Sequence, residues 1–285
     1  AREASFSFRI LWGKQNELSV FAYPDRGEPR ELVRVPLDSV AYLHDFITTP
    51  EHLIFVIPPV RIDLLRAISR LGSLEDLFRW KPEEGTRVLV VPIDDPEAYV
   101  WFDTGAFFVW HFANAFMEQR RLHVDFVHWP DFGSFDAIGD ADTDPTSAPS
   151  LRRLSLDLDH KDAALSMLSD MPCEFPSVQA SASGKRSESI WSQVERGGRS
   201  GVARHDLMTN NTALFWFDPG QLASEPNLLP SQKGEDATLI STLVYDVEAH
   251  TSFLAIFDAF HIEDGPITRI WLTHHIPMTF HGHWA

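Results

Sequence analysis

Short runs of alternating apolar and polar residues, separated by Gly, Pro, Asp and Asn, recur along all 285 residues of the chain. Alternation with a period of two is typical of strands, and turn residues at modest spacing favour antiparallel sheets. We therefore predict an all-β fold: a sandwich, a barrel or a propeller. The expected strands are Ser5–Trp12, Leu18–Tyr23, Glu31–Pro36, His52–Ile57, Arg87–Pro92, Ala98–Asp103, Leu122–His128, Leu151–Leu158, Ala213–Asp218, Thr238–Tyr245, Thr251–Asp258 and Ile267–Leu272.

Helical periodicity is confined to one segment. Ile62–Leu71 has the spacing of a helix, with a continuation over Ser73–Arg79, and predicts a short helical insertion. Two stretches rich in small and polar residues, Asp131–Pro149 and Gln179–Gly201, are expected to be surface loops. Strand patterning resumes on both sides of each loop, so we expect a single domain over residues 1–285.

Composition excludes several classes of partner and location. The 24 basic and 41 acidic residues leave a formal net charge of −17, so a nucleic-acid partner is not expected. The single cysteine, Cys173, cannot form an intrachain disulfide, which favours a cytoplasmic location. The longest apolar stretch, Phe107–Met117, is far shorter than the ~20 residues of a spanning helix. No transmembrane segment is expected, although peripheral membrane contact through an apolar patch stays open.

Three of the thirteen histidines stand out by their surroundings. His44 lies in Tyr-Leu-His-Asp-Phe, just upstream of a strong strand, and His111 lies in a densely apolar and aromatic segment. His281 lies in a tail that contains a second histidine after one glycine. A buried neutral imidazole must find a partner, and a metal ion is one such partner. On residue pattern alone, a surface histidine, a hydrogen-bonded core histidine and a chance metal-binding tail remain alternatives.

Other patterns favour competing functions only weakly. His123-Val-Asp125 matches half of the two-histidine, one-carboxylate iron motif, but no arginine follows His281 to bind a 2-oxo acid. No nucleophile elbow, Cys-x-x-Cys, phosphate-binding loop or dinucleotide fingerprint is present. We expect structural roles for the remaining strand and turn histidines: His52, His123, His128, His160, His205, His250 and His261.

Six segments, taken in order, carry a resemblance to a known family. His44-Asp-Phe, His111-x-x-Asn-Ala-Phe, Glu174-Phe-Pro and Ser224-Glu-Pro each match a family segment, as do the strand that ends at Tyr245 and the closing Pro-Met-Thr-Phe-His-Gly-His-Trp. Together they resemble the carotenoid cleavage oxygenases, a group that includes apocarotenoid, lignostilbene and resveratrol-cleaving enzymes. The similarity runs from His44 to Trp284.

This resemblance implies a seven-bladed β-propeller in which four histidines bind Fe(2+) on the axis. Carried over to this chain, His44, His111 and His281 are iron ligands, and Glu174 and Glu225 are carboxylates that hold ligand histidines. The family's first ligand histidine and its first such glutamate would lie before Ala1. We therefore expect this chain to be the C-terminal portion of the propeller, without its N-terminal part.

The implied activity is a dioxygenase that inserts both atoms of O2 across one C=C bond and releases two carbonyl products. The implied substrate is a small apolar olefin, a stilbenoid or an apocarotenoid, and the sequence does not distinguish them. Two alternatives remain: an isomerohydrolase that uses the same iron on a polyene ester, and a truncated, non-catalytic binding scaffold. The aromatic residues around His111 either line a substrate tunnel or form plain core: Phe107, Phe108, Trp110, Phe112 and Phe116.

Overall fold

The computed structural model describes residues 4–63, 77–132, 148–229, 236–277 and 281–282. Within these residues the chain is all-β, and its helical parts are 3-10 turns of three residues each, such as Pro82–Glu84. Consecutive strands pair antiparallel as meanders, as the punctuation by turn residues predicts.

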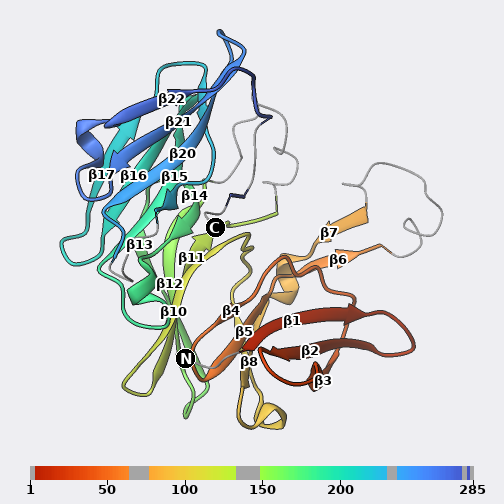
Figure 1. The fold of residues 1–285 in the computed structure, drawn as a ribbon. Helices are drawn as coiled ribbons and strands as arrows, with labels where there is room; N and C mark the ends of the chain where they lie inside the picture. The colour runs from red at the N-terminus through yellow and green to blue at the C-terminus, as the bar shows by residue number, and fades with distance from the viewer. Residues whose placement is uncertain (1–3, 64–76, 133–147, 230–235, 278–280, 283–285) are drawn as a thin grey trace.

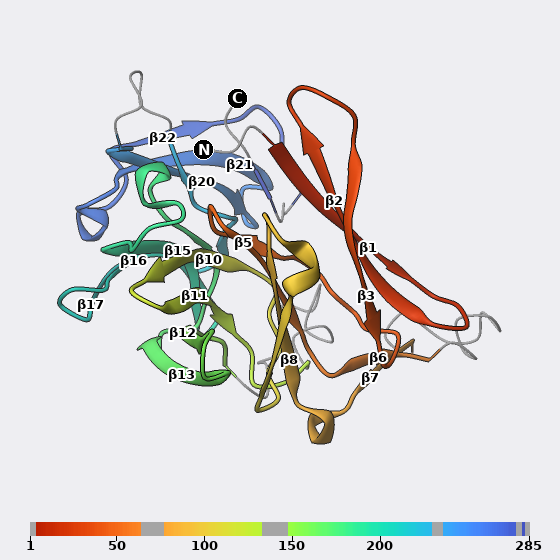
Figure 2. The ribbon, with the colours of Figure 1, turned by 90° about the horizontal axis from the view of Figure 1, so that it is seen from below.

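Five sheets follow one another in chain order, and Figures 1 and 2 show them side by side around part of a ring. The first sheet has three strands, the next three have four each, and the last has five. A separate two-stranded hairpin completes the described strands. In order, the sheets are β1 (Ala4–Leu11), β2 (Asn16–Pro24) and β3 (Arg30–Leu37); β4 (Ile47–Thr48), β5 (His52–Ile57), β8 (Thr86–Pro92) and β9 (Val100–Thr104); β10 (Phe112–Glu118), β11 (Arg121–His128), β12 (Ser150–Asp157) and β13 (Asp162–Ser169); β14 (Cys173–Ser177), β15 (Ser189–Arg196), β16 (Arg199–Asp206) and β17 (Asn211–Trp216); β18 (Gln221–Ala223), β19 (Asn227–Leu228), β20 (Leu239–Asp246), β21 (Thr251–Asp258) and β22 (Thr268–Trp271); the hairpin is β6 (Val60–Ile62) and β7 (Phe78–Trp80).

Neighbouring sheets pack face to face through separate apolar cores. Along β5, Leu53 and Phe55 face the first sheet, whereas Ile54 and Val56 face the third. The side chains of a strand alternate between its two faces, so a strand between two sheets needs apolar residues at every position. This requirement explains the unbroken apolar run from Leu53 to Ile57. Five stacked sheets of this kind are propeller blades; the expected count of seven is not tested by this chain.

All twelve predicted strands are present, with ends shifted by at most two residues. The predicted loop over Gln179–Gly201 is wrong in its second half, where β15 and β16 form a hairpin around Gly197 and Gly198. Serine richness suggested a loop, but Ser192 is fully buried and its Oγ lies 2.8 Å from His205 Nε2. Small hydroxyl side chains fill this strand between two sheets because each finds a hydrogen-bond partner.

The predicted helix falls mainly on residues 64–76, outside the described residues. Its predicted continuation to Arg79 is wrong at its end, because Phe78 and Arg79 belong to β7 and pair with β6. Phe78 packs edge-on against Tyr42, with ring centroids 5.0 Å apart. This contact joins the β6–β7 hairpin to the segment that precedes β4. The other predicted loop, Asp131–Pro149, lies mostly on residues 133–147, also outside the described residues.

Gly201 in β16 is a position where any side chain collides with the neighbouring strand. A Cβ atom there would lie 2.3 Å from the carbonyl oxygen of Phe215, a backbone atom that cannot move aside. We expect Gly201→Ala to lower the free energy of unfolding by about 1–3 kcal/mol. Chemical denaturation measures the loss. The control is Gly105→Ala, where no atom lies within 4 Å of the added Cβ; an equal loss in both variants would contradict the steric account.

The first strands of successive sheets bring the candidate site residues together. His44 precedes β4, His111 directly precedes β10, Glu174 lies in β14, and Glu225 follows β18. Figure 1 shows β4, β10 and β14 on the inner side of the sheets. Equivalent positions in consecutive blades therefore point to one region.

Candidate metal centre

Three imidazoles from distant parts of the chain meet in one group. His44, His111 and His281 each offer a ring nitrogen, and no two of these atoms are more than 4.8 Å apart. His111 Nε2 and His281 Nε2 are 3.3 Å apart. Two nitrogens that each lie about 2.1 Å from one metal ion are separated by roughly 3.0–3.4 Å in octahedral or tetrahedral geometry. The His111–His281 spacing therefore fits a shared metal ion.

His111 is the most firmly held of the three. Its Nδ1 lies 2.8 Å from Glu174 Oε2, and both side chains are mostly buried, at 17% and 14% exposure. Glu174 is fixed in turn, because Trp129 Nε1–H donates to its Oε1 at 2.5 Å. A carboxylate at Nδ1 requires the proton on that nitrogen, and this tautomer leaves the Nε2 lone pair free for a metal ion.

His281, like His111, has a glutamate carboxylate beside its Nδ1 atom. Its Nδ1 lies 3.5 Å from Glu225 Oε2, and the backbone N–H of Gly282 donates to that same oxygen at 2.9 Å. The side chain of His281 is 56% exposed, so water reaches this imidazole. Both predicted glutamates thus lie behind predicted histidines, and each aligns Nε2 of its partner toward the group.

His44 completes the group, and in the described part of the chain no carboxylate bonds to its ring. Its ring packs edge-on against Trp110 and His111, with centroid distances of 4.9 and 5.5 Å. Partial burial disfavours the charged imidazolium and, together with the nearby His111, lowers the pKa of His44, although part of the residue is exposed to solvent. A lowered pKa keeps the imidazole neutral, which is the form that binds metal ions.

Phe175 and Trp129 are site residues that the sequence did not single out. The Phe175 ring lies 4.8 Å from His111 and 5.6 Å from His281, and its φ of 52° is in the left-handed region. That backbone turn lets the Phe175 N–H donate to Glu174 Oε2 at 3.1 Å. The Glu-Phe-Pro segment was the available signal for Phe175, whereas nothing local marked Trp129.

The aromatic residues around His111 separate into different roles. Of the five, Trp110 contacts the histidine group, and Phe108 is buried in the core below it. Phe116 packs beside His123 on another face of the sheet. Phe108 and Phe116 are therefore core residues, at 0% and 1% exposure, which is one of the two roles expected of these rings.

The alternative iron motif at His123 and Asp125 is not assembled. His123 Nδ1 lies 2.8 Å from Ser155 Oγ, and Asp125 forms a two-point ion pair with Arg153 at 2.6 and 2.8 Å. Among the described residues, the only metal-capable group of three or more His, Cys, Asp or Glu side chains is the one formed by the three predicted histidines.

Comparison with known proteins decides the family. The family model described as retinal pigment epithelial membrane protein matches residues 3–285. The chain belongs to this family. The prediction of a carotenoid cleavage oxygenase relative is confirmed, because the curated relatives include the apocarotenoid-15,15'-oxygenase of Synechocystis, which is 28% identical over 255 residues.

Other relatives of the family share the same region. The lignostilbene-alpha,beta-dioxygenase isozyme III of Sphingomonas paucimobilis is 29% identical over 208 residues, which are 65% of this chain and 42% of that protein. The Synechocystis relative is matched over 86% of this chain and 52% of its own length. The chain thus spans about half the length of the curated relatives that it matches.

Solved structures show the same fold. The cobalt-substituted Synechocystis ACO superposes with a TM-score of 0.88 at 24% identity, and the match covers 99% of this chain and 61% of that one. This likeness confirms the all-β propeller-type fold. In the described part of the chain, no helix has the length and apolar character to cross a membrane.

Proposed function

We propose that this chain forms part of a non-haem Fe(2+) dioxygenase that cleaves a C=C bond of an apocarotenoid or a stilbenoid into two carbonyl products. The observation that carries the proposal is the group of His44, His111 and His281. Two of its members have their Nδ1 atoms turned toward Glu174 and Glu225. Neutral imidazoles suit Fe(2+), and a substituted metal is part of the Synechocystis relative's structure.

In this proposal the three histidines hold the iron, which when bound supplies the site for O2 activation. Glu174 and Glu225 keep the Nδ1 protons of His111 and His281 in place, so that both Nε2 atoms stay available. Trp110 and Phe175 flank the imidazoles with apolar rings. Apolar rings at a metal site favour a hydrocarbon substrate.

The substrate class follows from the relatives and from this apolar lining. One relative is named for an apocarotenoid and another for lignostilbene, both of which contain conjugated C=C bonds. Three expectations from the sequence remain predictions: a fourth histidine ligand, a segment that supplies it, and a cytoplasmic location.

The test combines iron binding with O2 consumption. We expect the 285-residue chain to bind Fe(2+) with a stoichiometry near one under anaerobic conditions, and to consume O2 when an apocarotenoid or a stilbenoid is added. Both oxygen atoms from labelled O2 should enter the two carbonyl products. A product formed without O2 consumption would replace the dioxygenase with the isomerohydrolase alternative, and failure to bind iron would favour the non-catalytic scaffold.

A further inference from the structure

Asn114 on β10 is a buried amide whose donors and acceptor all bond to one other segment of the chain. The residue lies three positions after His111 and is 3% exposed. Its Nδ2 donates to the carbonyls of Ala182 and Lys185, at 3.0 and 2.6 Å. Its Oδ1 accepts from the backbone N–H of Gly184 at 3.1 Å. An asparagine amide has two N–H donors and one carbonyl oxygen, so this segment satisfies both ends of the group.

The segment that this amide holds, residues 178–188, connects β14 to β15 and reaches several other sheets. Near its start, Gln179 bonds in both directions with the backbone of Ala237, at 2.7 and 2.9 Å, just before β20 in the fifth sheet. Further along, Gly184 has a φ of 75°, and a Cβ atom there would lie 3.0 Å from Pro50 Cδ. Pro50 lies in the turn between β4 and β5 of the second sheet. The segment thus belongs to the fourth sheet and contacts the second, third and fifth.

The two strands that Asn114 links also carry a histidine of the metal centre and its carboxylate. His111 directly precedes β10, Glu174 lies in β14, and His111 Nδ1 is 2.8 Å from Glu174 Oε2. Asn114 is therefore a second link between the strand of this histidine and the chain that follows this carboxylate. Donor–acceptor distances of good hydrogen bonds vary by only about 0.5 Å. A small slide between the third and fourth sheets would thus break the bond between His111 and Glu174.

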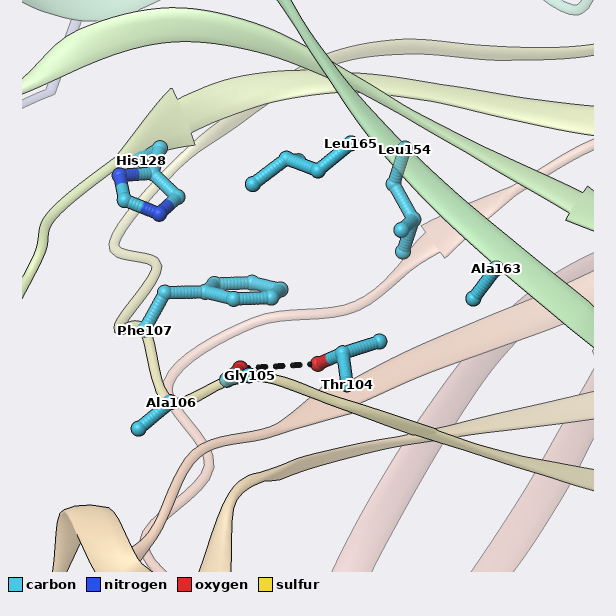
Figure 3. Close-up of a pocket in the computed structure, with 8 residues that line it drawn as sticks. All are labelled: Thr104, Gly105, Ala106, Phe107, His128, Leu154, Ala163 and Leu165. Carbon is cyan, nitrogen blue, oxygen red and sulfur yellow. Dashed lines mark hydrogen bonds between the residues drawn. The ribbon is translucent and has the colours of Figure 1, made fainter.

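Apolar packing alone does not prevent such a slide. The third and fourth sheets share an apolar core that includes Val127, Leu151 and Ile190, and hydrophobic contacts have no preferred direction. On its other side the third sheet packs incompletely against the second. Figure 3 shows the cavity of about 170 Å³ that remains there, with Phe107 and Leu154 among its lining residues. We therefore expect directional hydrogen bonds to set the position of the third sheet.

We propose that Asn114 is a positioning residue of the metal centre. It holds β10 against the segment that follows β14, and so keeps His111 Nδ1 aligned with Glu174. That alignment keeps the proton on Nδ1 and leaves Nε2 available for a metal ion. The consequence for metal binding rests on the proposed function of the three-histidine group. The alignment itself exists without a metal ion, so it can be tested separately.

The first experiment measures hydrogen exchange in metal-free protein labelled with ¹⁵N in its histidines. The Nδ1–H of His111 is mostly buried and bonds to Glu174, so it should exchange slowly with water. Asn114→Ala removes three hydrogen bonds, and we expect this exchange to become about tenfold faster, since even one lost bond shifts an equilibrium by up to roughly that factor. The matched control is Gln179→Ala, which removes a buried amide from the same segment but leaves the bonds of Asn114 in place. Exchange at His111 should be unchanged in the control.

The second experiment measures Co(2+) affinity and the visible absorption of bound Co(2+), the metal in the Synechocystis relative's structure. Asn114→Ala should weaken binding by about tenfold, the lower end of the effect of losing a partner behind a ligand histidine, and should change the absorption spectrum. Gln179→Ala should do neither, even if both variants lose stability. If the unchanged protein bound no Co(2+), the proposed function would fail, while exchange at His111 would still decide the role of Asn114.

Gly184→Ala covers the case in which Asn114→Ala does not fold. The added Cβ meets Pro50 in a backbone conformation that favours glycine, so the segment must move away from the amide of Asn114 while the amide itself is kept. The Nδ1–H of His111 should exchange faster in this variant as well. An unchanged His111 signal in the variants that fold, or an equal change in Gln179→Ala, would overturn the proposal.

Discussion

His111→Ala is expected to abolish stoichiometric iron binding. His111 lies nearest the middle of the histidine group, 3.3 Å from His281 Nε2 and in ring contact with His44. Loss of a partner behind a ligand histidine typically costs ~10–100-fold in metal affinity, and loss of the ligand itself should cost more. We expect the affinity for Fe(2+) to fall by more than about 100-fold and O2 consumption to disappear. Anaerobic Fe(2+) titration and elemental analysis measure the change.

The matched control is His123→Ala, which removes a half-buried histidine from the same sheet. His123 bonds to Ser155 and takes no part in the group, so its loss should leave iron stoichiometry unchanged. Thermal unfolding of both metal-free variants separates a lost ligand from a lost fold. If a well-folded His111→Ala variant bound iron as tightly as the unchanged protein, the three histidines would not be the metal site.

Local patterns were sufficient to predict the strands that alternate or that form continuous apolar runs. His52–Ile57 and Thr251–Asp258 were predicted with the bounds that the structure has. The strands β15 and β16 were missed because burial there is shared with serines, whose hydroxyls pair only in the folded sheet. Composition cannot distinguish such a strand from a surface loop, since the difference lies in hydrogen-bond partners that only the folded sheet supplies.

The candidate site depended on resemblance more than on pattern. His111 and His281 are 170 positions apart, so no periodicity links them, and only the order of the family segments predicted that they would meet. The same segments pointed to Glu174 and Glu225, which lie behind the expected histidines. Trp129 was not predicted. Its hydrogen bond to Glu174 depends on how the sheet of β11 packs against the sheet of β14, and the sequence does not show that packing.

Arg153→Met is expected to destabilise the fold more than any exposed charge substitution. Asp125 on β11 and Arg153 on β12 are directly opposite each other, and the Asp125 side chain is 0% exposed. Removal of the arginine leaves a buried carboxylate without its cation, which typically costs about 3–5 kcal/mol. Chemical denaturation should show this loss. The control is Arg120→Met, which should change stability little, because its ion pair with Asp159 is exposed and screened by solvent.

The pH dependence of this loss identifies its cause. Burial raises the pKa of Asp125, and the Arg153 guanidinium opposes that rise in the unchanged protein. Without Arg153 the pKa of Asp125 rises further, so the variant gains stability relative to the unchanged protein as the carboxyl group is protonated. The difference in unfolding free energy should thus be largest near neutral pH and shrink as pH falls toward about 4, the ordinary pKa of a carboxyl group. A loss that stays constant with pH would mean that Arg153 acts through packing on Phe116, from which its guanidinium lies 5.0 Å, and not through charge.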